Sequence, residues 1–407
     1  MKAAILFLAV AFPVSVIFAV QQQLTYESKV LNIEIPVRVF EGDRFVDDLA
    51  IGDFEVLDNG VPQRLEAFYL IKKASIKRRE EISKFSPFTD RYFYLIFEMN
   101  EYDPKINKAL TYFINEILMP GDNLILVTPL KTYRLRADMS LLSDKRKIVR
   151  DLIGHLRKDI VGGSSEYRDV LEEMKSLVRS LSGGLSSDEG NVDFESFMVS
   201  GGRSIEERLQ TYVYLLTRLE NIRSLDAANL RDFARYLENQ AGQKEVFLFY
   251  QREFVPKLHQ NVLQALMNQY NDRPDILLNL SSIFDSYKRD TPLDVDFIKE
   301  SFANASAAVH FLFVTKPAET TPGLVMEEQS EDIYAPFREM SRATGGLSVS
   351  SANVEYGMKA AMDASENYYL LYYIPQNYVT DGSFHKIEVR VKRKGCRVSH
   401  RSGYIAD

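Results

Sequence analysis

The sequence predicts an α/β protein in which a doubly wound, mostly parallel sheet is inserted into a β-sandwich formed from both chain ends. Through the middle of the chain, apolar runs without alternation are separated by amphipathic helical patterns, as expected for strands buried on both faces. Before residue 74 and after residue 366, apolar and polar residues alternate, which is typical of antiparallel strands. Neither β segment holds enough strands for its own core, so one shared sandwich is favoured over two small β domains.

The first β segment is predicted from alternation and from one turn. Between Val30 and Phe40 every second residue is apolar, which indicates a strand with one buried face. Asn59-Gly60 separates two short strand patterns and favours a tight hairpin, because both turn residues tolerate positive φ. Residues 72–81 carry a dense run of charges, and we expect them to form a solvated linker.

The central α/β segment begins at Arg91. Its strands are predicted from short apolar runs, and its helices from apolar residues three and four positions apart. The expected strands are 92–97, 124–127, 132–135 (an edge strand), 246–249, 309–314 and 347–350, and the expected helices are 104–118, 143–156, 164–181, 204–237 with a bend near 224, 293–305, 334–343 and 354–364. This succession of strands and helices predicts the doubly wound sheet.

Two stretches interrupt the α/β pattern. Residues 183–204 are rich in Gly and Ser and predict a surface insertion, and residues 254–290 predict a second, mostly helical one. The predicted organisation is a signal peptide at 1–19, a discontinuous β-sandwich domain from 24–85 plus 366–405, and an α/β domain at 90–364.

The N-terminal residues have the layout of a secretory signal. Met1-Lys2 give a positive start, an apolar run extends from Ala3 to Val20, and Ala19 is a small residue before the expected cut. Pro13 interrupts a run that is already short for a membrane span, so cleavage is favoured over an uncleaved anchor. We therefore expect an exported protein, periplasmic or extracellular and envelope-associated, with no transmembrane span in its mature form.

Bulk composition excludes some functions. The chain has 407 residues, 45% of them hydrophobic, so it can bury a sizeable core. Its formal charge of -7 argues against nucleic acid or an anionic membrane as the main partner. Cys396 is the single cysteine, which excludes an intrachain disulfide framework and any multi-cysteine metal site.

Several motifs occur in one order along the chain, and together they resemble a known family. They are DFEVLDNGVPQ at 53–63, GQK at 242–244, ATGG at 343–346, and, in the tail, YLLYYIP at 369–375, GSFHKIEV at 382–389 and RSGY at 401–404. The chain from about 25 to 405 resembles exported bacterial proteins of an acidobacterial type, described as von Willebrand factor type A-related. This resemblance implies a type A-like fold for residues 90–364.

The resemblance also implies where a metal site would lie. Type A domains bind a divalent ion through Asp-x-Ser-x-Ser after the first strand, a Thr from a later loop and an Asp after the fourth strand. Here Glu98, Asn100 and Tyr102 stand at the first motif, Ser164 at the Thr position and Gln251 at the last Asp. These replacements imply a degenerate metal-ion-dependent adhesion site with no metal and no cofactor, with Mg²⁺ or another divalent ion as the less favoured alternative.

Other chemistry is weakly indicated. The five histidines show no metal-ligand spacing, and the sequence has neither a nucleophile elbow nor a phosphate loop. We expect a non-enzymatic module that binds a protein or cell-surface ligand through the degenerate adhesion site. The alternatives are an enzyme of the cell envelope with an unrecognised site, and a structural spacer. Convergent polar groups with shifted pKa values in a pocket would favour the enzyme.

Overall fold

The computed structural model describes residues 32–83, 85–138, 144–183, 203–223, 225–285, 294–320, 323–376 and 378–407. The expected signal peptide and most of the expected insertion at 183–204 lie outside these residues. None of the helices within the described residues is long and apolar enough to cross a membrane.

A six-stranded sheet forms the centre of the α/β part, in the order β14-β12-β10-β7-β8-β9. Its strands are β7 (Arg91–Glu98), β8 (Asn123–Val127), β9 (Thr132–Arg136), β10 (Gln243–Gln251), β12 (Ala307–Val314) and β14 (Ser348–Ser351). All neighbours are parallel except β9, which is antiparallel to β8 at one edge. The predicted mostly parallel sheet and its edge strand are therefore confirmed.

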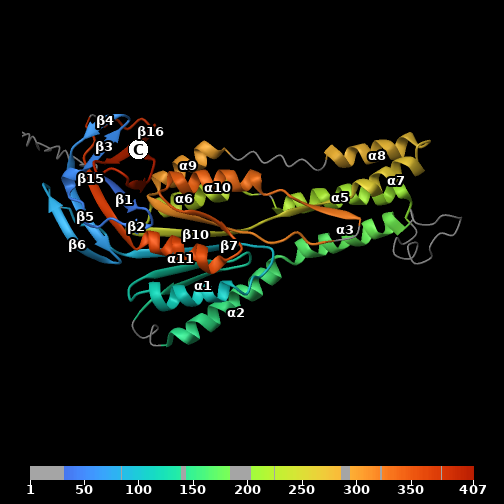
Figure 1. The fold of residues 1–407 in the computed structure, drawn as a ribbon, viewed down its shortest axis with the longest axis horizontal. Helices are drawn as coiled ribbons and strands as arrows, with labels where there is room; N and C mark the ends of the chain where they lie inside the picture. The colour runs from blue at the N-terminus through green and yellow to red at the C-terminus, as the bar shows by residue number, and fades with distance from the viewer. Residues whose placement is uncertain are drawn as a thin grey trace, which may run out of the picture. The chain divides into compact units, whose positions relative to one another are not determined.

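Helices cover both faces of this sheet (Figure 1). One face carries α1 (Ile106–Tyr112), α2 (Lys145–Gly163) and α11 (Val354–Ser365), and the other carries α6 (Ala227–Glu238), α9 (Val295–Asn304) and α10 (Glu331–Ala343). Alternate residues of each strand pack into the two cores. Phe93, Leu95 and Phe97 of β7 belong to the first core, and Tyr94 belongs to the second. This is the doubly wound arrangement expected from the sequence.

The β part consists of two antiparallel sheets, each with strands from both chain ends. The first has the order β17-β1-β15-β5-β6, with β2 paired to β1, and the second has the order β18-β16-β3-β4. The N-terminal strands are β1 (Ile33–Glu41), β2 (Arg44–Phe45), β3 (Phe54–Asp58), β4 (Val61–Gln63), β5 (Leu65–Lys72) and β6 (Ser75–Glu81), and the C-terminal strands are β15 (Asn367–Tyr373), β16 (Phe384–Val391), β17 (Arg397–His400) and β18 (Gly403–Ile405).

The two β sheets pack on each other as the predicted sandwich. The Phe54 ring lies 5.2 Å from that of Tyr369, and the Tyr373 hydroxyl donates to Asp58 across the interface at 2.9 Å. The backbone pairs β1–β15 and β3–β16 join the two chain ends directly. Two separate β cores are therefore excluded.

Local signals in the β part are confirmed at one turn and wrong at one strand. Asn59 and Gly60 form the β3–β4 turn with φ of 47° and 81°, as the hairpin signal predicts. The expected linker at 72–81 is mostly β6, which pairs with β5 along its length. Its charged side chains suit an edge strand that is largely exposed, so charge density alone did not distinguish a strand from a linker.

Beyond the carboxyl end of the sheet, four helices and a two-stranded ribbon share a third hydrophobic core, which we call the helical arm (Figure 1). It comprises α3 (Ser165–Gly183), α5 (Ile205–Arg223), α7 (Gln260–Gln269), α8 (Pro274–Asp285), β11 (Phe254–Leu258) and β13 (Leu324–Glu328). Residues 254–290 begin with strand β11, and the rest of their described part is mostly helical, as expected. Pro256 concealed this strand, but a two-stranded ribbon tolerates a proline.

Candidate functional site

The carboxyl end of β7 places Glu98 on the face of the sheet that α6 covers. Side chains alternate along a strand, so Tyr94, Ile96 and Glu98 share this face, whereas Phe97 packs on the other side against Phe249, with ring centroids 4.4 Å apart. Glu98 is the last residue of β7. Its carboxyl group therefore lies where ligands bind in many doubly wound sheets, outside the carboxyl ends of the strands.

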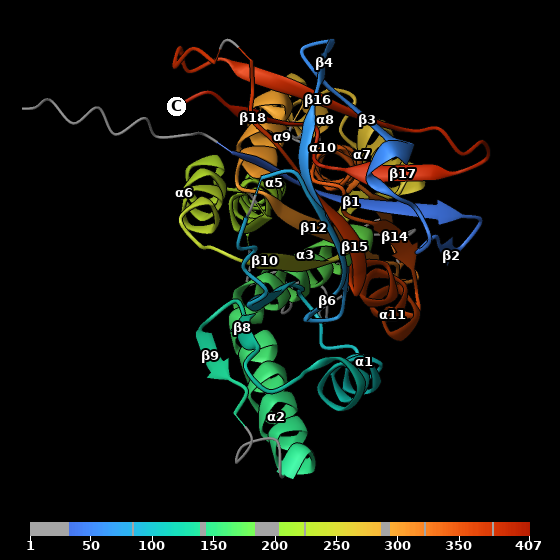
Figure 2. The same ribbon diagram turned by 90° about the vertical axis from the view of Figure 1, so that its left-hand side faces the viewer.

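A groove of about 510 Å³ runs between α6 and the strands β7, β8 and β9. Figure 2 shows α6 and the β8–β9 pair that border it. The lining residues are Tyr94, Ile96, Glu98, Ile125, Val127, Thr132, Arg134, Leu225, Asp226, Asn229, Leu230, Phe233 and Tyr236. Most of these side chains are apolar or aromatic, and the charged ones lie on different elements.

The Glu98 carboxylate has no hydrogen-bond or ion-pair partner among the described residues. Its neighbour across the sheet is Tyr250, whose hydroxyl donates to the buried carboxylate of Glu253 at 2.6 Å. The surrounding protein, and secondly the negative charge of Glu253, raise the pKa of Glu98 to about 7. Glu98 is nevertheless an exposed residue, and it lines the groove.

Two cations at the same end of the sheet are already paired with other carboxylates. Arg252 forms an ion pair with Glu328 of β13 at 2.9 Å, and Lys316 forms one with Glu101 at 2.6 Å. Neither is paired with Glu98, which keeps an uncompensated negative charge whenever it is ionised.

Asn100 and Gln251 meet at the loop after β7. The side-chain oxygen of Gln251 accepts hydrogen bonds from the backbone N–H groups of Asn100, at 3.2 Å, and of Glu101, at 3.0 Å. Gln251 is buried, so these bonds satisfy groups that would otherwise lack a partner. The amide at the position where the resemblance implies an aspartate therefore fixes the loop.

Tyr102 and Ser164 lie apart from Glu98. The Tyr102 hydroxyl is hydrogen-bonded to Asn107, and the Arg157 guanidinium lies 6.0 Å from the Tyr102 ring. The Ser164 hydroxyl is buried at the end of α2, where it donates to the Ile160 carbonyl at 2.7 Å. Of the five residues assigned to the adhesion site, Asn100 and Gln251 are joined by a hydrogen bond, and Glu98 lies on the opposite face of the sheet from Tyr102.

The donor set at this end of the sheet does not fit a hard divalent ion. Within the described part of the chain, no group of three or more His, Cys, Asp or Glu side chains could hold a metal ion. Glu98 and Glu253 are two nearby carboxylates, but one oxygen of Glu253 is already bonded to Tyr250. An ion that prefers six or more oxygen ligands would therefore lack most of its shell here.

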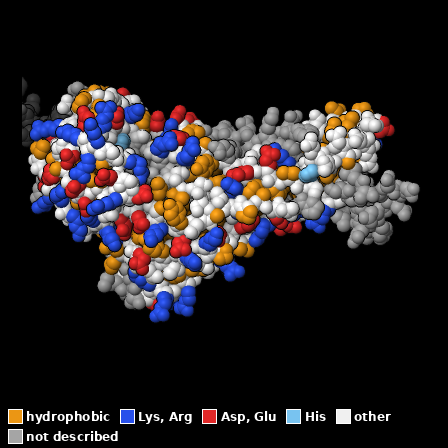
Figure 3. Space-filling view, viewed as in Figure 1, with side chains coloured by type: hydrophobic (Ala, Val, Ile, Leu, Met, Phe, Trp, Pro, Cys, Tyr) orange, Lys and Arg blue, Asp and Glu red, His pale blue; other side chains and the backbone are white. Residues whose placement is uncertain are grey.

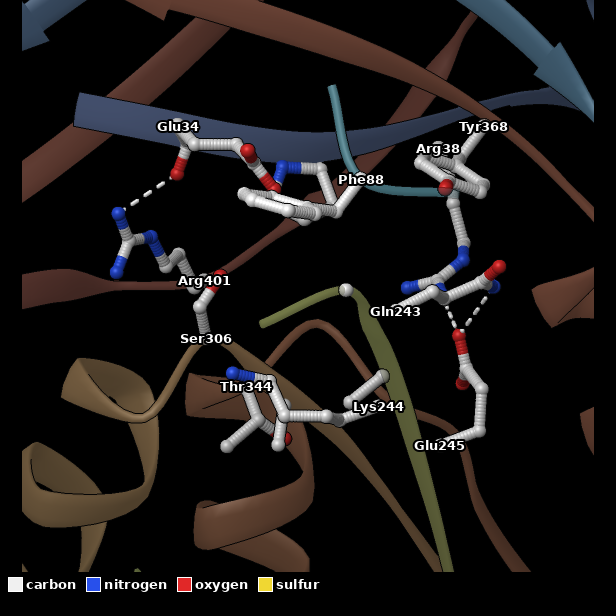
Figure 4. A pocket seen from close by; sticks show the side chains of 14 residues that line it. Glu34, Arg38, Phe88, Gln243, Lys244, Glu245, Ser306, Thr344, Tyr368 and Arg401 are labelled. Carbon is white, nitrogen blue, oxygen red and sulfur yellow. Dashed lines mark hydrogen bonds and ion pairs between the residues drawn. The ribbon is translucent and has the colours of Figure 1, made fainter. Parts of the chain in front are cut away.

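A smaller enclosed cavity lies where the β-sandwich meets the amino ends of β10 and β12 (Figure 4). Arg38 of β1 donates to Glu245 of β10 at 2.7 Å, and His310 of β12 contacts the other carboxylate oxygen at 2.8 Å. Burial opposes ionisation of Glu245, but the charge of Arg38 and the hydrogen bond of His310 outweigh it and lower the pKa of Glu245. At about 20 Å³ the cavity has room for about one water molecule, so it is too small for a ligand. The ion pair beside it joins the β-sandwich to the parallel sheet.

Sequence reasoning identified Glu98 but missed the rest of its groove. Phe233 and Tyr236 of α6, Arg134 of β9 and Glu253 were not singled out as site residues. The sequence pattern of an apolar helix face is the same whether the sheet covers that face fully or only in part. Only the packing of α6 against the sheet shows the difference.

Comparison with protein-family models and with curated proteins found no match. Among solved structures, the chain is similar to the human COPII-coat protein Sec24c, with a TM-score of 0.27 and 6% sequence identity. The similarity covers 80% of this chain and 44% of that one, so the chain spans less than half of the protein it matches. It is too weak to transfer any property from that protein to this chain.

Proposed function

We propose that the protein is an exported, non-enzymatic module that binds another protein through the groove beside Glu98, without a metal ion. In this proposal residues 90–364 form a von Willebrand factor type A-like domain, inserted in a β domain of residues 24–85 and 366–405. The observation that carries the proposal is an open, mainly apolar groove at the carboxyl end of the sheet with one unpaired carboxylate. Apolar clefts with a few placed polar groups are typical binding sites.

The lining of the groove favours binding over catalysis. Glu98 is one group with a shifted pKa, which an enzyme could use as a general acid or base. A hydrolase would also need a nucleophile or an activated water, and neither His nor Cys is among the lining residues.

The surface favours a protein partner over a polyanion. On the face seen in Figure 3, basic and acidic side chains are interspersed and form no continuous basic stripe. Nucleic-acid binding rewards a continuous basic stripe, and the chain has a formal charge of -7. The remaining candidate, a spacer with no specific partner, differs from our proposal only in leaving the groove without a ligand.

Site-specific photo-crosslinking tests the proposal. A photoreactive amino acid replaces Thr132, which is exposed at the groove, and in a matched control it replaces Thr217, which is exposed on α5. We expect a discrete protein adduct in cell-envelope extract from the Thr132 variant and not from the Thr217 variant. Equal labelling at both positions, or no protein adduct at Thr132, would show that the groove is not the binding site.

Export is tested separately. The apolar run followed by Ala19 supports removal of about the first 19 residues. N-terminal sequencing of the protein from a native extract should therefore begin near residue 20. Recovery of the chain with Met1 intact would contradict this part of the proposal.

A further inference from the structure

We propose that the Glu98 end of the groove binds a basic side chain, a lysine or arginine, of the partner protein. This inference rests on the proposed function, because it names the chemistry of the ligand at the same site. It follows from three features of the groove: an unmatched negative end, an apolar middle and a positive far end.

The Glu98 end of the groove is acidic and lacks a matching cation. Asp226 of α6 also lines the groove, and its carboxylate accepts hydrogen bonds from the N–H groups of Ala228 and Asn229. Glu253 adds a third carboxylate close enough to raise the pKa of Glu98. A cation from outside would supply the counter-charge that the described residues leave out.

The middle of the groove is apolar. Ile96 and Val127 line it from the sheet, and Leu225 and Leu230 line it from the segment around α6. Lysine and arginine carry a methylene stem that packs on apolar surface while the charged head reaches a polar group. A small inorganic cation would use only the carboxylate, so the apolar lining favours a basic side chain over a free ion.

The far end of the groove has the opposite charge. Arg134 is in register with Ile125, which pairs with Tyr94, four residues before Glu98 on β7. Four residues of a β-strand span about 13 Å, so Arg134 and Glu98 are separated by about that distance along the sheet. The Arg134 guanidinium lies 6.0 Å from the ring centroid of Tyr236. A cationic group is therefore repelled from the far end, which fixes the direction in which a bound segment lies.

Two short peptides test the inference directly. The probes are acetyl-Ala-Ala-Lys-Ala-Ala-amide and the same peptide with norleucine in place of lysine, and binding is titrated by ligand-observed NMR. Norleucine keeps the aliphatic stem and removes the charge. Since a hydrogen bond to a charged group is stronger than one between neutral groups, we expect the lysine peptide to bind about tenfold more tightly or better.

Variants assign the effect to Glu98. Glu98→Gln keeps the size of the side chain and should reduce lysine-peptide binding to the level of the norleucine peptide. Glu173→Gln, on the exposed surface of α3, removes one negative charge outside the groove and should leave binding unchanged. Melting temperatures no lower than that of the unmodified protein would show that both variants are folded.

Equal binding of the two peptides, or lysine preference that persists in Glu98→Gln, would overturn the inference. The proposed function fails in a different way. A protein adduct at Thr132 together with no Glu98-dependent lysine preference would overturn the ligand chemistry alone. Loss of the Thr132 adduct would overturn both.

Discussion

At the scale of single residues, the structure separates side chains that stabilise the fold from one that does not. Gln251 satisfies two backbone N–H groups, and Arg38 compensates the buried charge of Glu245. Glu98 has no such partner among the described residues, and its neighbour Glu253 disfavours its ionised form. An ionised carboxylate that lowers stability is more easily understood as part of a binding site than as part of the core.

The pH dependence of stability should reveal this carboxylate. The pKa of Glu98 is raised from 4.5 to about 7, so the folded state holds a proton that the unfolded chain releases at lower pH. Its contribution to the free energy of unfolding therefore falls as pH rises from about 4.5 to 7, and stays low above that range. Glu98→Gln removes this penalty.

Urea unfolding at pH 5 and pH 8 measures the effect. We expect Glu98→Gln to gain stability over the unmodified protein at pH 8 but not at pH 5. Because the side chain is exposed, the gain should be about 1 kcal/mol or less. A difference that is the same at both pH values would contradict the raised pKa.

The Arg38 ion pair should be costly to break from one side. Arg38→Met leaves the Glu245 carboxylate buried without its main counter-charge, and we expect a loss of about 3–5 kcal/mol in the free energy of unfolding. Adding Glu245→Gln removes the orphaned charge and should recover part of that loss. If Arg38→Met lowers the free energy of unfolding by less than about 1 kcal/mol, the ion pair does not stabilise the contact between the β-sandwich and the parallel sheet.

At the scale of elements, α6 has two roles, because it covers the sheet and also forms one wall of the groove. Its first turn is fixed by Asp226, whose side chain accepts from the N–H groups of Ala228 and Asn229 at 2.8 and 3.4 Å. Leu237 is buried against the sheet, whereas Leu230 and Phe233 are only partly covered. The side of α6 that carries Leu230 and Phe233 is thus the side that a ligand would contact.

Removing the cap of α6 should weaken the groove wall. Asp226→Ala leaves two N–H groups at the start of the helix without their side-chain acceptor, and we expect a loss of about 1 kcal/mol in the free energy of unfolding. Asp232→Ala is the control, because Asp232 is exposed within the same helix. Equal effects of the two substitutions in urea unfolding would show that the cap contributes nothing specific.

Elements could be predicted where local sequence and tertiary context agree. The buried strands β7, β8, β10 and β12 were predicted because strands covered on both faces must be apolar throughout. Strand β6 was missed because its solvated charges are equally compatible with a linker. Strand β13 was missed since its pairing with β11 joins segments about seventy residues apart, which no local pattern records.

The sequence placed Glu98 at the end of a strand but did not show the geometry around it. Glu98 followed from the end of an apolar strand and from the family resemblance. That Glu98 and Tyr102 lie on opposite faces depends on the path of the loop after β7, which Gln251 holds from another strand. Glu98 lacks a positive partner because Arg252 and Lys316 form ion pairs with other carboxylates. Such pairings exist only in the folded molecule.

At the scale of the whole molecule, the described chain comprises the parallel sheet with its helices, the β-sandwich at the amino ends of its strands, and the helical arm beyond their carboxyl ends. In many doubly wound sheets, the face at the carboxyl ends of the strands binds ligands. Here β11 and β13 continue from β10 and β12 into the core of the arm. The open groove beside α6 is therefore the part of this face that we expect to bind.

Divalent ions should leave the protein unaffected. A bound ion at a hundredfold excess over its Kd would stabilise the folded state by about 2.7 kcal/mol. With so few carboxylate ligands, we expect binding no tighter than the millimolar range, so Mg²⁺, Mn²⁺, Ca²⁺ and EDTA at about 1 mM should not change the melting temperature. A rise of several degrees with one ion that Glu98→Ala abolishes would show a working metal site.

Strand β1 cannot pair with its two long neighbours until most of the chain has been synthesised. Its neighbours are β15 and β17, which are made more than three hundred residues later. While the chain grows, Ile33, Ile35 and Val37 form an apolar strand with neither long neighbour in place, the kind of segment that aggregates or is degraded. Residues 367–400 therefore supply both long neighbours of β1, and a chain that stops before residue 367 leaves the apolar side chains of β1 without them.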